Sequence, residues 1–344
     1  MKTEGIKQTK IKQNRTIRKV VVVLLSALLS FVILSMILSA VIFGVLFKRT
    51  QTFSPFEISY SEIDMQKYPR KPVSFYSNEN KLQGYIYGTP KSAKGIVIIV
   101  NGINSNANSH LPEIMYFVDN GWCAFSYDGT GVGSSEGDGI RGLSQGKIDL
   151  ESAIDFVKNN KSTVGLPIVL YGHSAGGYAS VAILEDNKDI AAVVCIAGFD
   201  SPSETMHYFA KQKVGFLADI EYPFMQLQSF FLFGKDFDLS ASDAINSTST
   251  PVIIVEADGD TVFSEELGIS RFRDKIQNPN VTFLTVDEPY RNQHSTIWFS
   301  ENAARYISEV SRGGETIDKE KANELDEEFM AFLLLFYDHA LQNK

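Results

Sequence analysis

Residues 167–177 read PIVLYGHSAGG, and this stretch decides how the rest of the chain is interpreted. A short β-branched and apolar run, 168–171, is followed at 175–183 by the small residues of a closely packed helix. Between them lies the pattern G-x-S-x-G, made of Gly172, His173, Ser174, Ala175 and Gly176. Because a serine on so sharp a strand-to-helix turn has a strained backbone, the residues two positions away must lack bulk.

This turn has two interpretations. If Ser174 is a nucleophile, its hydroxyl stands exposed at the end of a sheet, and the N–H of Ala175 points out of the start of a helix, where negative charge is favoured. Alternatively, the glycines serve packing alone and the serine is incidental, since G-x-S-x-G occurs often by chance. The pattern indicates catalysis only if a base and an acid are found elsewhere in the chain.

The chain has 344 residues and a net charge of −9, long enough for one large α/β domain with additional segments. Residues 1–49 contain nine basic residues and one acidic residue, so residues 50–344 have a net charge of −17. An acidic body of this kind would repel a phosphate backbone, which argues against nucleic acid as a partner. The two cysteines, Cys123 and Cys195, lie in apolar strand-like runs and are interpreted as core thiols. No zinc-type Cys/His cluster occurs, and the sequence predicts no metal site.

Residues 20–47 run without a single charge, after a polar and basic segment at 1–19. A spanning helix needs about 20 apolar residues, whereas the apolar part of a secretory signal has about 7–15. We therefore predict a transmembrane signal anchor. Seven basic residues precede it, which by the positive-inside rule places the N-terminus in the cytoplasm and the globular part outside. A long signal peptide that is cleaved near Ser39 and Ala40 is the alternative.

After a predicted linker at 48–70, strand patterns alternate with helix patterns. Strands are expected at 71–76, 81–88, 95–100, 122–127, 168–171, 191–197, 251–256 and 281–286, and helices at 111–120, 143–159, 175–183, 265–276 and 295–312. Unbroken apolar runs are typical of strands buried on both faces of a parallel sheet. The alternation predicts an α/β fold over residues 71–312, with a mostly parallel central sheet and helices on both faces.

Two segments stand outside this alternation. Residues 198–250 contain many aromatic side chains but no convincing strand, and so long a segment in a compact domain should have its own structure. We predict a small helical cap at about 199–249. The C-terminal segment, 313–344, is predicted to pack on the body through an amphipathic helix at 318–342.

Of the five histidines, one is well placed to act as a base. His173 adjoins the serine within the turn, so its side chain should point away from the hydroxyl. His110 opens a helix, His207 lies in the predicted cap and His339 in the C-terminal helix. His294 lies in the loop after the last predicted strand, and loops at the carboxyl edge of a parallel sheet surround the ligand site.

Two aspartates are candidates for the acid. Asp258 and Asp260 follow the strand predicted at 251–256, and either could reach the histidine. Because Asp and Gly also favour turns, we expect one aspartate to serve the turn and the other the histidine. Ser174, one of these aspartates and His294 then occur in the chain order Ser, Asp, His, each after a predicted strand.

With these residues the sequence resembles the α/β-hydrolase superfamily, in particular its small lipases, esterases and serine aminopeptidase-like enzymes. The resemblance covers residues 71 to about 312. The stretch 172–177 looks like the nucleophile elbow of that family, and Asp260-Thr261-Val262 looks like its acid loop, which favours Asp260 over Asp258. The segment DGTGVGS at 128–134 resembles the Gly-rich loop that follows the fourth strand, a structural support.

The resemblance also implies an oxyanion hole. Asn101-Gly102-Ile103 stands where relatives have a His-Gly-x turn, which implies that the N–H of Ile103 completes the hole together with that of Ala175. Asn101 in place of the usual histidine changes what holds this loop. Ala257 stands where a glycine is common. Neither departure removes a catalytic atom.

The implied reaction is hydrolysis of a carboxylic ester through an acyl-enzyme, carried out by Ser174, His294 and Asp260 with no metal or organic cofactor. The anchor and the aromatic cap favour a lipid-like substrate, although these aromatics are equally explained as the cap's own core. Peptidase or acyltransferase activity on the same fold is the first alternative. A membrane-anchored binding module without turnover and a structural surface anchor are further alternatives, against which the complete set of catalytic residue types argues.

Overall fold

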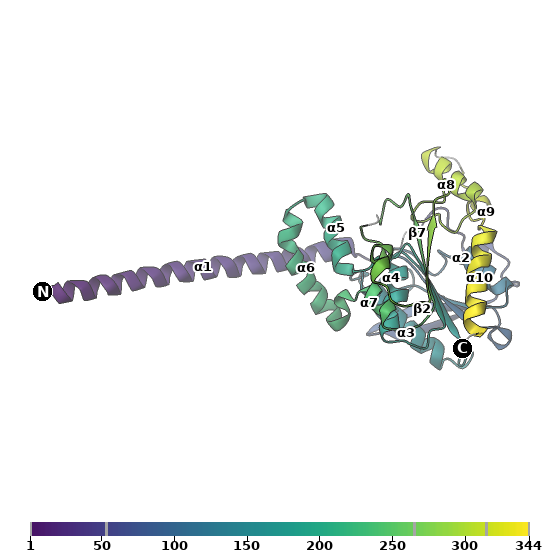
Figure 1. The fold of residues 1–344 in the computed structure, drawn as a ribbon, viewed down its shortest axis with the longest axis horizontal. Helices are drawn as coiled ribbons and strands as arrows, with labels where there is room; N and C mark the ends of the chain where they lie inside the picture. Colours follow the sequence, from purple (N-terminus) through teal and green to yellow (C-terminus); the bar gives the residue numbers. More distant parts are fainter. Residues whose placement is uncertain (1, 52–53, 264–265, 314–315, 343–344) are drawn as a thin grey trace.

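The computed structural model describes residues 2–51, 54–263, 266–313 and 316–342 of the chain (Figure 1). Its body is a sheet with helices on both faces, and the long helix α1 (Lys2–Leu46) extends away from this body. The predicted fold class, a mostly parallel α/β sheet with an apolar N-terminal helix, is confirmed.

The central sheet has eight strands in the order β1-β2-β4-β3-β5-β6-β7-β8. The strands are β1 (Arg70–Ser77), β2 (Asn80–Tyr87), β3 (Ile96–Val100), β4 (Cys123–Tyr127), β5 (Ile168–His173), β6 (Ala192–Ile196), β7 (Val252–Ala257) and β8 (Val281–Val286). Strand β2 is antiparallel to both of its neighbours, and all other pairs are parallel. Every residue of β3 to β6 is buried, which is why these strands read as unbroken apolar runs.

Two layers of helices cover the sheet (Figure 1). One face packs on α3 (Gln145–Asn159), α4 (Ala175–Ala182) and α7 (Ala241–Asn246), and the other on α2 (Leu111–Asp119) and α10 (Glu327–Gln342). Alternate residues of β3 separate the two cores: Ile96 and Ile98 join the first, Val97 and Ile99 the second. Because the parallel strands all end at one edge, the loops after β3, β5, β7 and β8 meet there.

Three of the predicted helices differ from the structure. Where a helix is expected at 265–276, the described part holds a 3₁₀ segment, Ile269–Lys275, and residue 265 lies outside the described residues. Only Ile269 of this segment is buried, too little apolar surface to stabilise an α-helix. Helix α8 (Glu301–Gly313) begins six residues later than predicted, because residues 295–298 form turns that bury Ile297 and Trp298, and Phe299 forms a β-bridge with Leu325.

The helix predicted at 318–342 is two helices, α9 (Lys319–Ala322) and α10. Side chains at the break satisfy the exposed backbone groups. The amide of Asn323 donates to the carbonyl oxygens of Phe56 and Lys319, and Asp326 accepts from the N–H of Phe329 at the start of α10. These side-chain bonds replace the helical backbone bonds that are lost at the break. The apolar periodicity of the sequence continues through the break and therefore does not indicate it.

The segment 199–249 is helical. It contains α5 (Pro202–Val214), α6 (Leu217–Phe233), a 3₁₀ segment (Gly234–Asp238) and α7. Helix α7 packs back on α4 in the core, so the protruding part consists of α5 and α6, which we call the cap. Helix α6 crosses α1 on the side of the body from which α1 emerges (Figure 1).

The chain that follows α1 is attached to the body. Lys48 forms a β-bridge with Gly139, and Thr50 forms one with Val132. The guanidinium group of Arg49 donates to the carbonyl oxygens of Gly137 and Gly133, at 2.8 Å each. The first residues of the predicted linker therefore continue the fold as a strand-like edge on the Gly-rich loop.

Candidate active site

Ser174 lies at the turn between β5 and α4, where its backbone has φ 58° and ψ −122°. This is a strained conformation for a residue with a side chain. The two flanking glycines are required by close approach: a Cβ on Gly176 would overlap the carbonyl oxygen of Val100, and one on Gly172 would overlap that of Gly176. The G-x-S-x-G spacing thus follows from the packing of this turn against β3 at Gly176 and against α4 at Gly172.

His294 brings the serine and an aspartate into one hydrogen-bonded series. Its Nε2 lies 3.0 Å from the Oγ of Ser174, and its Nδ1 lies 2.7 Å from Oδ2 of Asp260. A carboxylate only accepts, so Nδ1 carries the proton and Nε2 presents its lone pair to the serine hydroxyl. The side chains of His294 and Asp260 are 12% and 4% exposed, so the series is largely shielded from water.

Asp260 serves the turn and the histidine at once. Its Oδ1 accepts from the N–H groups of Val262 at 2.7 Å and Phe263 at 2.9 Å, while Oδ2 faces His294. Asp258 instead accepts from the side-chain amide of Asn292 at 2.8 Å. The expected division of roles between the two aspartates is therefore wrong, because the two oxygens of one carboxylate fill both.

Ile103 and Ala175 line the same small cavity next to Ser174. Within the described residues, neither N–H has a hydrogen-bond acceptor, as donors waiting for an oxyanion would require. Asn101 holds this loop through its side-chain amide, which donates to the carbonyl oxygen of Tyr127 at 3.1 Å. Its Oδ1 is buried without a partner in the part of the chain that the structure describes.

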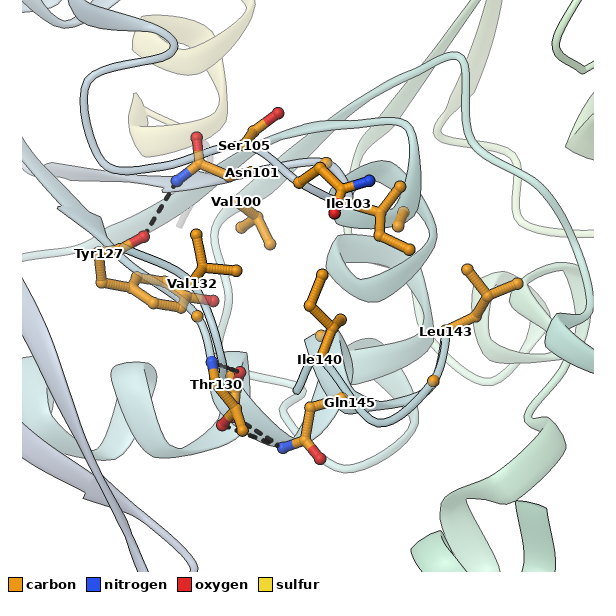
Figure 2. A pocket seen from close by; sticks show the side chains of 17 residues that line it. Val100, Asn101, Ile103, Ser105, Tyr127, Thr130, Val132, Ile140, Leu143 and Gln145 are labelled. Atoms are coloured by element: carbon orange, nitrogen blue, oxygen red, sulfur yellow. Dashed lines mark hydrogen bonds between the residues drawn. The ribbon is translucent and has the colours of Figure 1, made fainter. Parts of the chain in front are cut away.

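Figure 2 shows this cavity, which encloses about 60 Å³. Its apolar lining consists of Val100, Ile103, Val132, Ile140 and Leu143. At the other end lies a polar group in which Asp149 accepts from Thr130 and Gln145. Burial raises the pKa of Asp149, against the effect of these hydrogen bonds. The cavity thus combines an apolar wall with the two candidate oxyanion donors.

A buried layer of rings lies behind His294, and the sequence did not reveal it. The imidazole of His173 contacts the loop of His294, with its Nε2 2.9 Å from the backbone carbonyl of His294. Trp298 stacks edge-on against His173 at 4.8 Å between ring centroids. Burial, together with the nearby His294 and His110, lowers the pKa of His173 well below its ordinary value, so this ring is neutral.

His110 belongs to the same layer. Its Nδ1 lies 2.6 Å from Oε1 of Glu113, and both side chains are buried. Tyr171 also donates to this carboxylate, at 3.3 Å. His110 and Glu113 are three residues apart at the start of α2, and this spacing is the one signal in the sequence that could have indicated their contact.

The Gly-rich loop 128–134 is held by Asp128. One oxygen of its carboxylate accepts from the N–H of Ala107 and the other from that of Ser134, at 2.8 Å each. Thr50, just beyond α1, reaches the oxyanion loop, where its hydroxyl donates to Oδ1 of Asn104. The two loops beside the cavity are therefore held by side chains other than those of Ser174, His294 and Asp260.

The described residues contain no group of three or more His, Cys, Asp or Glu side chains that could hold a metal ion. Both cysteines are buried free thiols, and burial raises the pKa of Cys123 to about 11. These thiols are therefore protonated and unreactive at neutral pH.

Residues 91–229 match the model of a family described as serine aminopeptidase, S33. The sheet order, the Ser174 turn and this match agree on one fold. The chain has the α/β-hydrolase fold. Among solved structures, this chain is similar to the esterase Pf2001 of Pyrococcus furiosus, with 20% identity, a TM-score of 0.54 and coverage of 73% of this chain and 91% of that one. It is also similar to Est1E of Butyrivibrio proteoclasticus with bound ferulic acid, with 16% identity, a TM-score of 0.51 and coverage of 69% and 95%. At these identities the likeness shows the fold.

Two kinds of curated relative match part of this chain. The polyketide transferase grgF of Penicillium sp. is 28% identical over 134 residues, which cover 38% of this chain and 45% of that protein. The uncharacterized protein YfhR of Salmonella typhi is 29% identical over 148 residues, 40% of this chain and 49% of that one. The chain thus spans about half the length of the curated relatives that it matches.

Proposed function

We propose that this chain is a serine hydrolase that cleaves carboxylic esters. The observation that carries the proposal is the series of hydrogen bonds from Ser174 through His294 to Asp260. Of the three side chains, only the serine can act as an uncharged nucleophile with a base at hydrogen-bond distance. The buried carboxylate orients the imidazole and stabilises the positive charge that it acquires.

The reaction proceeds in two halves. Ser174 Oγ attacks the ester carbonyl carbon while His294 Nε2 takes the hydroxyl proton, and the N–H groups of Ile103 and Ala175 hold the oxyanion. The C–O bond to the alcohol then breaks, and the alcohol leaves with the proton from His294. Water next attacks the acyl-serine, giving its proton to Nε2. Collapse of this second intermediate releases the carboxylic acid and returns the proton to Oγ.

The cavity favours a short acyl group or the carbonyl end of a longer one. It encloses about 60 Å³, and apolar side chains form most of its wall. For comparison, an apolar cavity of roughly 150 Å³ holds one benzene molecule. A lipid-like ester therefore fits only if its chain continues beyond Ile140 and Leu143 toward the cap.

Acyl transfer to an acceptor other than water is the second candidate function. It is favoured by the similarity to the polyketide transferase grgF, whose solved structure from Penicillium sp. sh18 aligns with a TM-score of 0.51 over 80% of this chain and 99% of that one. A peptidase is the reading that the S33 description would favour. All three reactions share the acyl-enzyme, so they differ only in the leaving group and in the acceptor.

For the N-terminal region, we propose a retained membrane anchor with residues 1–19 in the cytoplasm and the catalytic domain outside. Residues 13–46 of α1 are long and apolar enough to span a bilayer. A signal sequence would pass the same test, but Ser35, which precedes the alternative cleavage site, is buried and donates to Glu221 of α6, which supports retention of the helix. The proposed organisation is then tail 1–19, anchor 20–47, connection 48–70, hydrolase domain 71–312 and C-terminal segment 313–344.

The test is labelling of the full-length protein in detergent with a fluorophosphonate probe. Wild type should be labelled, Ser174→Ala and His294→Ala should not, and Ser134→Ala, which changes an exposed serine on the Gly-rich loop, should be labelled like wild type. Thermal unfolding of each variant establishes that it is folded. A series of p-nitrophenyl esters, with and without an added alcohol, then separates hydrolysis from transfer. An unlabelled but folded wild type would reject the serine hydrolase and favour the binding module.

A further inference from the structure

One face of the cap helix α6 exposes large apolar side chains. Leu217, Ile220, Leu227 and Phe231 are 49%, 43%, 40% and 68% exposed and recur every three to seven residues, as one side of a helix requires. Phe216, just before α6, and Phe230 extend the same surface. We call these six residues the apolar face of α6. Monomeric soluble proteins seldom leave so continuous a surface without a partner.

The partner is indicated by what the middle of α6 touches. Ser35 of α1 donates to Oε1 of Glu221 at 3.0 Å, and Ser39 donates to the carbonyl oxygen of Phe224 at 3.4 Å. The rings of Phe31 and Phe224 meet edge-on at 5.7 Å between centroids. Helix α6 is thus joined to the apolar segment of α1 by small-residue hydrogen bonds and ring packing, as paired helices in membranes are.

These contacts fix the depth of α6 relative to a bilayer. The hydrocarbon core is about 30 Å thick, and a helix rises about 1.5 Å per residue, so about 20 residues cross it. Counted from Val20, where the apolar run begins, the core ends near Ser39. Phe31, Ser35 and Ser39 then lie in the leaflet nearer the body, and α6 lies at the same level.

The direction of α6 suits that position. It crosses α1 and is the part of the body nearest the N-terminal end of α1 (Figure 1). In Figure 1 α6 runs steeply across α1, so with α1 across the bilayer α6 lies closer to the membrane plane, where an amphipathic helix turns its apolar face toward the acyl chains. At the tip of the cap, Lys211 pairs with Asp219 at 3.1 Å, and the exposed Lys213 precedes Phe216, where a basic side chain beside an apolar face favours lipid headgroups.

We propose that α6 is a second membrane-embedded element, which lies in the plane of the leaflet beside α1 and contacts lipid acyl chains through its apolar face. The proposal rests on the proposed membrane span of α1. Behind α6, Met225 packs with Phe43, Val132 and Ile140, and the last two line the candidate active-site cavity. A continuous apolar layer therefore connects the leaflet with the cavity.

The experiment places an environment-sensitive label at chosen positions of the full-length protein in lipid vesicles. Phe231→Cys and Ile220→Cys report on α6, Leu28→Cys on the free part of α1, and Val164→Cys on an exposed loop of the body. The native thiols Cys123 and Cys195 are buried, so a nitrobenzoxadiazole reagent labels the introduced cysteine in the folded protein. Lipids with a spin label near the headgroup or deep in the chain then quench the dye according to its depth.

We expect blue-shifted emission at residues 220 and 231 and stronger quenching by the shallow spin label than by the deep one. Leu28→Cys should be quenched more by the deep label, and Val164→Cys by neither. If the two α6 positions behave like Val164→Cys while Leu28→Cys is quenched, α1 spans the bilayer and the proposal for α6 is wrong. A blue shift without quenching would show a protein neighbour and also overturn it. If Leu28→Cys is unquenched, the span and the proposal fail together.

Discussion

The Nε2–H group of His173 donates to the backbone carbonyl of His294 over 2.9 Å, so the residue next to the candidate nucleophile holds the loop of its base. A carbonyl oxygen only accepts, which assigns the proton of His173 to Nε2. Trp298 packs against the same ring and leaves it little freedom. The turn of Ser174 and the loop of His294 are therefore joined by a second contact besides the one between their functional side chains.

Replacing His173 should impair catalysis through the position of His294. In His173→Ala the carbonyl of His294 loses its donor, and a shift of the imidazole by about 1 Å can cost on the order of 100-fold in rate. We expect kcat to fall by about 10- to 100-fold with KM nearly unchanged. Steady-state kinetics with a short p-nitrophenyl ester measure both.

His173→Gln provides the matched control, because its side-chain amide can donate to the same carbonyl oxygen. It should recover part of the lost kcat. If both variants instead raise KM and leave kcat intact, His173 shapes the substrate pocket and does not position the base.

The stability of the folded protein should fall as the pH is lowered through the histidine range. The pKa of His173 is well below its ordinary value in the folded state, because the ring is buried and lies near His294 and His110. Below about pH 6.5 the unfolded chain binds a proton at this position that the folded chain does not. The free energy of unfolding then decreases with falling pH, by at most about 1.4 kcal/mol per pH unit for this one group.

Chemical unfolding of wild type and His173→Gln between pH 7.5 and 5 isolates this contribution, since all other groups are shared. The difference between the two unfolding free energies should change with pH in the direction that favours the variant at acidic pH. A constant difference across that range would mean that His173 is protonated alike in both states.

The sequence predicted those parts of the fold and of the site that are encoded locally. The buried strands were evident from unbroken apolar runs, and the turn of Ser174 from glycines that its backbone geometry requires. His294 followed from its place after the last strand of a parallel sheet. Such features depend on neighbours in the sequence or on a general property of α/β sheets.

What the sequence did not predict depends on distances that arise only in the folded chain. The two oxygens of Asp260 point in different directions, so one residue takes both roles that two aspartates were expected to share. The attachment of Arg49 uses backbone carbonyl oxygens, which every residue has and no pattern marks. The late start of α8 reflects the burial of Trp298 in a turn. An apolar side chain at this position fits the periodicity of a helix equally well, so the pattern does not distinguish the two structures.

The two aspartates of the acid loop should respond very differently to amidation. Asp260→Asn removes the charge that stabilises the imidazolium and favours the wrong tautomer of His294, a change that costs about 10⁴ in kcat in other serine hydrolases. We expect a loss on the order of 10³ to 10⁴ here, measured as kcat with a short ester. Asp258→Asn changes a carboxylate that accepts from Asn292 and should lower kcat less than about 10-fold. Equal losses would indicate that both carboxylates act on His294.

The end of α1 should contribute to the stability of the body. Phe47 is buried with Val132 and Ile140, so Phe47→Ala should lower the free energy of unfolding by about 3 kcal/mol. Val45, two residues away, is 66% exposed, and Val45→Ala should have little effect. Denaturant unfolding of the full-length protein in one detergent compares them. Equal small effects would mean that α1 is tethered to the body without packing on it.

The size of the cavity should set the preferred length of the acyl chain. Ile140 lies in the apolar wall between the cavity and the layer of Phe43 and Met225, so Ile140→Ala extends the cavity toward the cap. Each additional buried methylene contributes about 0.8 kcal/mol, or about fourfold in kcat/KM. The ratio of kcat/KM for a hexanoate ester to that for an acetate ester should therefore rise in the variant. Val164→Ala, on an exposed loop, should leave the ratio unchanged. If Ile140→Ala lowers kcat/KM equally for both esters, the acyl chain takes another path out of the site.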